Sequence, residues 1–166
     1  ADAVVEAKLD FARHTGVTLE SRGIVADWNK AENKMTIYHN GQAPHMMQHI
    51  IAKHLDLNEG LVRIVSRDVG GSFGIKVHVY PDEMAVTAIS KKIGRPVKFI
   101  ADRLESFTTD IHARCHKISG KLGVDKNGKI LAMEIDDLSG IGPFSMYPRT
   151  SAIETNQVLN LSGAPY

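Results

Sequence analysis

Arg67-Asp68-Val69-Gly70-Gly71-Ser72-Phe73-Gly74-Ile75-Lys76 is the stretch from which the fold can be worked out, because the pattern of the chain changes across it. The apolar, β-branched run at 61–65 predicts a buried strand before it, and Tyr80-Pro81-Asp82-Glu83 opens a helical pattern after it. Three glycines and one phenylalanine in a strand-to-helix turn leave backbone N–H groups accessible to a ligand. Their spacing matches neither a G-x-G-x-x-G dinucleotide pattern nor a P-loop, so a tight turn without a ligand is the alternative.

The composition narrows the class of protein. The 166 residues fit one domain or slightly more, with a formal net charge of +1 and both signs of charge mixed along the chain. This balance gives no indication of a nucleic-acid surface or of a patch for an anionic membrane. No run approaches the ~18 apolar residues of a membrane span. The single cysteine, Cys115, cannot form an internal disulfide, which favours a reducing compartment and a cytoplasmic location.

Hydrophobic periodicity outlines the elements on both sides of the glycine turn. Two hairpins flank a pair of helices, and Asn127-Gly128 is a good turn signal for the second hairpin. The pattern predicts strands at 23–28, 34–39, 61–66 and 97–100, helices from Pro44 to about Leu57 and at 81–93, a short helix or loop at 102–109, a hairpin of 119–124 with 129–136, and a short strand near Val4.

This order of elements predicts an α+β fold, a two-layer α/β arrangement with a mixed sheet. A ββαβαβ unit is followed by the start of a second, hairpin-led unit. We place the boundary between residues 1–110 and residues 111–166. Both ends of the chain look cut from a longer protein, because Ala1 is not preceded by a Met and the last residues form no closing element.

The histidines do not form a recognisable metal site. His45 and His49 lie four residues apart on a predicted helix, but the glutamate of the zinc-protease motif is absent. Cys115 on a strand points away from His112 and His116. A metal-dependent hydrolase that uses its histidines therefore remains a minor alternative.

Other side chains are equally poor candidates for catalysis. Cys115 lacks a readable cationic pocket, and the adjacent Asp136 and Asp137 face opposite sides of a strand. Gln42 is a better candidate, because it lies between a strand end and a helix start and its neutral amide can donate or accept. It would share a cleft with the Gly70–Gly74 turn if both lie at one edge of the sheet; the alternative is a surface glutamine.

Several motifs occur together in one order, from about Leu19 to Phe144. They are the glycine turn, Gly41-Gln42-Ala43-Pro44-His45, Gly94-Arg95-Pro96-Val97-Lys98-Phe99, Asp102-Arg103, Ala113-Arg114 and Gly128-Lys129-Ile130. The set resembles the molybdenum-binding large subunit of the xanthine dehydrogenase / aldehyde oxidase family, especially carbon monoxide dehydrogenase-type large subunits. Each motif is weak alone, but the ordered set is specific.

The resemblance implies a molybdenum hydroxylase. Its cofactor would be a molybdopterin dinucleotide, in the cytosine form, whose dithiolene rather than a protein histidine holds the molybdenum. Such enzymes hydroxylate a C–H bond with water as the oxygen source, or oxidise CO. Electrons leave through iron–sulfur and FAD partners, in an assembly that is a homodimer. Residues 1–110 would form a molybdopterin-binding subdomain.

The same resemblance assigns roles to six residues. Gln42 matches the family glutamine that approaches the apical oxo group of the molybdenum, so it is the candidate catalytic residue. Phe73 would bound the substrate space. The residues expected to contact the cofactor are Gln42, Gly70, Gly71, Ser72, Phe73 and Gly74, and no metal ligand is expected from the protein.

Three positions depart from the family pattern. Ser72 stands where a third glycine is usual, Ser21 where proline is frequent, and Gly142-Pro143-Phe144 where Gly-Ala-Phe/Tyr is usual. The family's glutamate base and substrate loop would lie in the remaining C-terminal part of the large subunit, after Tyr166. The isolated chain is therefore expected to be inactive and without bound cofactor. Aldehydes, purines, nicotinate-like rings, acyl-CoA aromatics and CO all remain open as substrates.

A catalytically silent α+β interaction domain that keeps the fold without the cofactor is the main alternative. Ser72 and the cut ends favour it.

Overall fold

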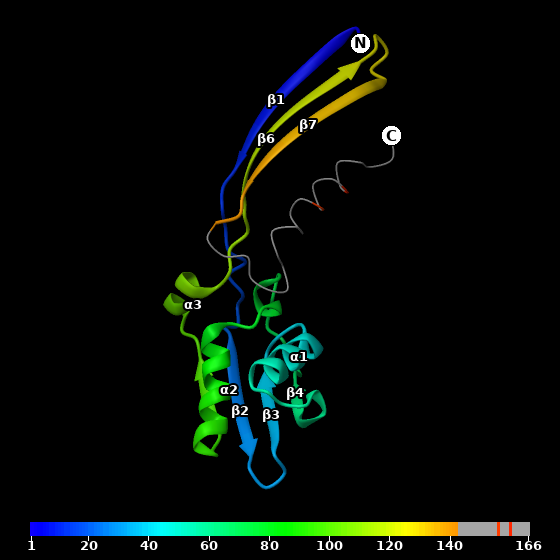
Figure 1. The fold of residues 1–166 in the computed structure, drawn as a ribbon. Helices are drawn as coiled ribbons and strands as arrows, with labels where there is room; N and C mark the ends of the chain where they lie inside the picture. Colours follow the sequence, from blue (N-terminus) through cyan, green and yellow to red (C-terminus); the bar gives the residue numbers. More distant parts are fainter. Residues whose placement is uncertain (143–155, 157–159, 161–166) are drawn as a thin grey trace. The chain divides into compact units, whose positions relative to one another are not determined.

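A computed structural model describes residues 1–142, 156 and 160, and it divides into two compact units. One unit comprises residues 15–111, and the other comprises residues 1–14 together with the chain from His112 onward (Figure 1). Of the departures from the family pattern, Pro143 and Phe144 lie outside the described residues. No helix among the described residues is long and apolar enough to cross a membrane.

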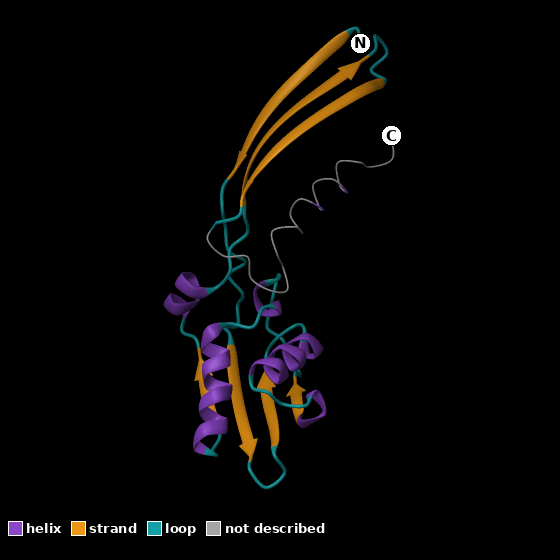
Figure 2. Ribbon diagram, viewed as in Figure 1, coloured by secondary structure: helices purple, strands orange, loops and turns teal. Residues whose placement is uncertain are grey.

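The unit of residues 15–111 is built on a four-stranded mixed sheet (Figure 2). The strand order is β4-β3-β2-β5; β3 and β4 run parallel, and β2 runs antiparallel to both β3 and β5. Its elements are β2 (Gly23–Asn29), β3 (Lys34–His39), α1 (Pro44–His54), η1 (Glu59–Leu61), β4 (Val62–Val65), η2 (Ile75–Val77), α2 (Pro81–Ile93), β5 (Val97–Ile100) and α3 (Arg103–Thr109). The predicted α+β class with a mixed sheet is confirmed.

One face of this sheet forms the core. Alternate residues of β2 and β3 point into it, among them Ile24, Ala26 and Ile37, which are at most 2% exposed. Helices α1 and α2 cover that face with Met47, Ile51 and Val86. The intervening residues point to the other face, where Tyr38 is 51% exposed. The unit therefore has two layers, as the sequence predicts.

Two predicted boundaries were wrong by a few residues. Helix α1 ends at His54 rather than near Leu57, because Asp56 takes a left-handed φ of 52° that a right-handed helix cannot contain. Strand β4 begins at Val62 because the 3-10 turn η1 occupies the preceding residues, and the Asn58 side chain caps that turn by accepting from Gly60 N.

The second unit is a three-stranded antiparallel sheet of order β1-β6-β7. Its strands are β1 (Ala3–Phe11), β6 (Cys115–Val124) and β7 (Ile130–Gly140). The predicted β6–β7 hairpin is present, although both strands are longer than expected. β1 pairs with β6 from Ala3↔Val124 to Phe11↔His116, so residues 1–14 associate with this unit, whereas the sequence division grouped them with residues 15–110. More than 100 residues separate the partners, and local periodicity carries no signal over that distance.

Candidate functional site

The parallel pairing of β3 and β4 brings Gln42 to the glycine turn. Parallel strands end at the same edge of a sheet; Gln42 follows β3, and the turn follows β4. The amide of Gln42 contacts the turn directly. Its Oε1 accepts from Gly74 N at 3.2 Å and from the Ser72 hydroxyl, and its backbone N–H donates to Lys76 O at 3.1 Å.

The turn has the unusual backbone that its glycines allow. Gly71 and Gly74 both have φ near 90°, and Phe73 has φ 51°. A phenylalanine in the left-handed region costs roughly 1–2 kcal/mol, so the surrounding contacts must hold it there. The residue is 79% exposed. A strained, exposed aromatic residue beside open backbone is typical of a ligand contact rather than of a core.

Only part of the turn's backbone is free to bind a ligand. Gly70 N donates to Glu20 Oε2 at 2.8 Å, and Gly74 N is engaged by Gln42. Among the described residues, the N–H groups of Gly71, Ser72 and Phe73 donate no hydrogen bond. The available donors are thus three successive N–H groups in the middle of the turn, and not those of the outer glycines.

Glu20 clamps the start of the turn. Besides accepting from Gly70 N, it donates its own N–H to Gly70 O at 3.1 Å, and its carboxylate pairs with Lys76 Nζ at 2.7 Å. Burial acts to raise the pKa of the Glu20 carboxyl, but the bonds from Lys76 and Gly70 N outweigh it and hold the pKa below its ordinary value. A Cβ on Gly70 would lie 2.5 Å from Glu20 Cβ, so only glycine fits there.

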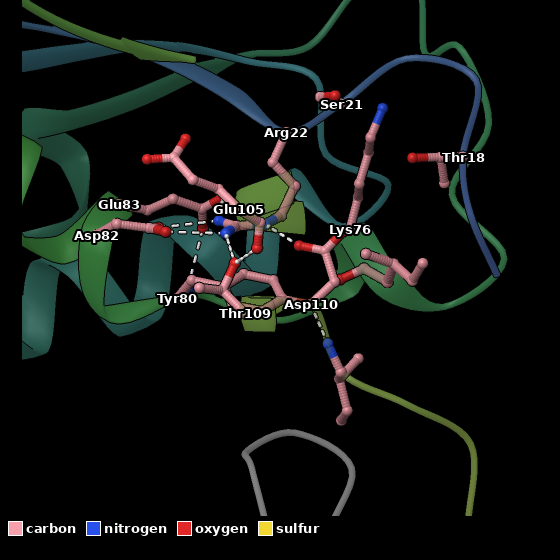
Figure 3. A network of polar contacts seen from close by, with 12 residues as sticks. Thr18, Ser21, Arg22, Lys76, Tyr80, Asp82, Glu83, Glu105, Thr109 and Asp110 are labelled. Atoms are coloured by element: carbon pink, nitrogen blue, oxygen red, sulfur yellow. Dashed lines mark hydrogen bonds and ion pairs between the residues drawn. The ribbon is translucent and has the colours of Figure 1, made fainter. Parts of the chain in front are cut away.

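A buried ionic network holds the segment before the sheet to both later helices (Figure 3). The Arg22 side chain, 1% exposed, donates to Asp82, Glu83 and Asp110 at 2.7–3.3 Å and lies 3.8 Å over the Tyr80 ring. Burial alone would lower the pKa of Arg22, but hydrogen bonds to Asp82 and Asp110 raise it above its ordinary value. Arg22 is therefore permanently charged and neutralised within the fold.

Tyr80 connects this network to the end of the glycine turn. Its hydroxyl donates to Ile75 O at 2.8 Å and accepts from Ile111 N at 3.2 Å, and burial raises the pKa of the phenol. Sequence reasoning missed the network. In the sequence, Asp82 and Glu83 only mark the start of a helical pattern, and their pairing with Arg22, 60 and 61 residues earlier, has no local signature.

Three of the histidines contact a carboxylate each. His49 pairs with Glu59 at 2.6 Å and His116 with Asp137 at 3.0 Å, while His39 is buried against Glu83 at 3.0 Å. Within the part of the chain that the structure describes, no group of three or more His, Cys, Asp or Glu side chains could hold a metal ion. The described residues thus offer no support for a hydrolase built on histidine ligands.

A hollow of about 540 Å³ opens at the same edge of the sheet as the turn. Its lining comes from the ends of the four strands and includes Tyr38, Asn40, Arg67, Asp68 and Ile100. Gln42 and residues 70–74 do not line it. The candidate site is therefore an exposed surface next to this hollow rather than a closed cleft.

The comparisons with known proteins agree on one family. The family model of the molybdopterin cofactor-binding domain matches residues 1–166. The carbon monoxide dehydrogenase large chain of Hydrogenophaga pseudoflava is 34% identical over 87% of this chain. The nicotine 6-hydroxylase large subunit of Paenarthrobacter nicotinovorans is 30% identical over 93% of it. These matches cover 18% and 19% of the two relatives, so the chain spans about a fifth of their length.

Solved structures with a similar fold agree with these sequence matches. The crystal structure of quinoline 2-oxidoreductase from Pseudomonas putida 86 matches with a TM-score of 0.85 and 30% identity, over 89% of this chain and 19% of that one. The reconstituted CO dehydrogenase from Oligotropha carboxidovorans matches with a TM-score of 0.78 and 31% identity, over 82% of this chain and 17% of that one. This chain belongs to the molybdopterin cofactor-binding domain family, whose relatives include carbon monoxide dehydrogenases and xanthine dehydrogenases.

Proposed function

We propose that this chain is part of the large subunit of a molybdenum hydroxylase, and that Gln42 and the Gly70–Gly74 turn contact the molybdenum cofactor. The observation that carries the proposal is the juxtaposition of the Gln42 amide with the glycine turn at one strand-end edge. The hydrogen-bond donors at this edge suit the molybdenum cofactor. A pterin with phosphates and an oxo-bearing metal presents many acceptors, and this edge offers neutral N–H donors that bind acceptors at any charge state.

When bound, such a cofactor supplies a redox-active molybdenum centre that oxidises substrate by two electrons with water as the oxygen source. The residues of this chain then bind the cofactor and orient it. Gln42 donates from Nε2 to an acceptor atom on the cofactor, and a neutral donor keeps that bond as the charge of the acceptor changes. The N–H groups of Gly71, Ser72 and Phe73 donate to the pterin portion. The exposed Phe73 ring bounds the substrate space and excludes water from it.

Gly70 and Gly74 have a different role in this proposal, because their N–H groups are already used within the chain. They shape the turn and leave the three central N–H groups for the cofactor. The clamp of Glu20 with Lys76 and the network around Arg22 hold the turn from behind. Cofactor binding would then depend on a fold that is largely preorganised, which lowers the entropy lost on binding.

The remaining features extend the same proposal to the whole protein. The cofactor is the cytosine dinucleotide form, and electrons pass to iron–sulfur and FAD subunits or domains. The complete assembly is a cytoplasmic homodimer. The rest of the large subunit completes the site, so the isolated chain does not turn over. Relatives whose names describe a large chain, a large subunit and a subunit gamma of a complex support the multi-subunit part.

The molybdenum and pterin content of the full-length protein tests the proposal. Gly71→Val should lose most of the bound molybdenum, since its φ of 90° is unsuited to valine and the new Cβ would lie 3.1 Å from the Phe73 ring. Gly128→Val is the matched control, because Gly128 has a similar φ of 83° in a hairpin turn of the other unit. Wild-type protein free of molybdenum, or equal loading of the two variants with both folded by circular dichroism, would count against it.

A further inference from the structure

Ser72 breaks the glycine pattern of the turn, and its hydroxyl has two partners. The backbone N–H of Lys76 donates to Ser72 Oγ at 3.1 Å, and the hydroxyl donates to Gln42 Oε1. Since a backbone N–H can only donate, the serine oxygen must act as the acceptor in the first bond. Its single hydrogen is then free to point at Gln42.

The hydrogen-bond partners of the Gln42 amide identify its oxygen and its nitrogen. Oxygen and nitrogen of a side-chain amide are assigned from their partners. Gly74 N, another backbone donor, lies 3.2 Å from the Gln42 atom that also meets the serine hydroxyl. That atom must therefore be the carbonyl oxygen. Both of its lone pairs are used, and rotating the amide by half a turn would set two donors against each other.

The nitrogen of the amide is consequently turned away from the turn. Among the described residues, Gln42 Nε2 donates no hydrogen bond, and the side chain is exposed. The bonds run in one direction, from Lys76 N–H through the serine hydroxyl to the glutamine oxygen. Such chains polarise each member, so the remaining N–H bonds become better donors.

We infer that Ser72 is a positioning residue: its hydroxyl locks the Gln42 carboxamide with Oε1 inward and the Nε2 hydrogens presented to an acceptor on the bound cofactor. The inference rests on the proposed function for the identity of the acceptor but not for the lock itself. Without the hydroxyl, Gly74 N alone would hold the oxygen, and the amide could swing or flip. A flipped amide would present a lone pair to the acceptor instead of a hydrogen.

Steady-state kinetics of the full-length, cofactor-loaded protein test the positioning role. Ser72→Ala should keep the molybdenum content and KM but lower kcat by about 2- to 10-fold, the range expected from losing one orienting hydrogen bond. Ser72→Thr, which keeps a hydroxyl, should lose less. An alanine variant with unchanged kcat, or a threonine variant as slow as the alanine one, would overturn the inference.

A double-variant cycle separates positioning from a general structural effect. In a Gln42→Ala background, Ser72→Ala should have no further effect on kcat, because the side chain that the hydroxyl orients is gone. If Ser72 only supported the backbone at Lys76, the second substitution would lower kcat as much as it does in the wild type. That additive result would contradict the inference.

Crystal structures of the full-length protein without cofactor test the lock independently of activity. Gln42 Oε1 should lie within hydrogen-bond distance of Gly74 N in the wild type and should leave it in Ser72→Ala. An unmoved glutamine in the alanine variant would refute the lock. Wild-type protein that binds no molybdenum, while the glutamine still moves in this way, would refute the proposed function and leave the lock standing.

Discussion

The two sheets of this chain are stabilised in different ways. In residues 15–111 the sheet buries one face beneath α1 and α2, and Ala26, Met35, Ile37 and Ile51 are completely inaccessible to solvent. In β1-β6-β7, by contrast, Gly123 is the one strand residue that is buried. The first sheet gains its stability from apolar burial, whereas the described residues give the second sheet only backbone pairing and cross-strand contacts.

The second sheet nevertheless has a clear sidedness. Residues paired across β1, β6 and β7 share a face, and one face is largely apolar: Val5, Ala7, Leu9, Phe11, Ile118, Leu122, Met133 and Ile135. The opposite face carries the exposed pairs Lys121–Glu6 and Lys117–Asp10. The alternation gives the sheet one apolar face of the kind that is usually buried, although no layer of described residues covers it.

Removing the Arg22 charge should have the largest effect. Arg22→Met leaves the buried carboxylates of Glu83 and Asp110 without their cation, and breaking a buried network of this kind costs about 3–5 kcal/mol. We expect that loss in the free energy of unfolding of residues 15–111. Urea unfolding followed by Trp28 fluorescence measures it, since this only tryptophan of the chain lies in that core. A loss below about 1 kcal/mol would mean that the network contributes little.

The same apolar truncation in each sheet compares them directly. Ile37→Ala should cost about 2–5 kcal/mol because it opens a cavity in a fully buried core. Ile135→Ala, at a position 41% exposed, should change local stability by about 0.5 kcal/mol or less. Amide hydrogen exchange of β3 and β7 measures the change in local stability at the two positions. Equal losses would show that the apolar face of the second sheet is covered in solution.

Removing the Glu20 carboxylate from the glycine turn should have a smaller effect on stability, and this effect should depend on pH. The folded-state pKa of Glu20 lies below its ordinary value of 4.5, so its contribution to stability is complete above that pH and is lost as pH falls through the folded pKa. Since the Glu20 side chain is 43% exposed and solvent screens its charge, Glu20→Gln should cost at most about 1 kcal/mol at neutral pH and less in acid. Unfolding titrations of both proteins across this range test it. A constant difference at every pH would exclude the carboxylate as the cause.

An exposed ion pair of the second sheet should have the smallest effect. Lys121→Met removes the partner of Glu6, 3.7 Å away, and both side chains are more than half exposed. Because water and salt screen such pairs, we expect a change within about 0.5 kcal/mol. Amide hydrogen exchange of β6 measures it and supplies the matched control for Arg22→Met. A loss comparable to that of the arginine variant would remove the distinction between buried and exposed ion pairs.

The elements with strong local periodicity could be predicted from the sequence. β2, β3, α2 and β5 lie within a residue of the expected bounds, because their burial alternates or repeats with a helical period. The meeting of Gln42 with the glycine turn was expected on the condition that both lie at one edge of the sheet. The parallel pairing of β3 and β4, which the order of the elements alone does not give, meets that condition.

Features that depend on distant partners could not be predicted. Arg22 meets Asp110 across 88 residues, and β1 meets β6 across more than a hundred, so no window of sequence contains both partners. Ser72 was interpreted as a departure from the glycine pattern, and it favoured a silent domain. Its contact with Gln42 depends on the rotamers of two side chains, which periodicity and motif spacing do not encode.

A crystal structure of the full-length protein purified with its cofactor would test the central claim most directly. We expect Gln42 Nε2 and the N–H groups of Gly71, Ser72 and Phe73 to lie within hydrogen-bond distance of the molybdenum cofactor, with the Phe73 ring beside the substrate space. A cofactor bound elsewhere in the protein, touching neither the glutamine nor this turn, would contradict it.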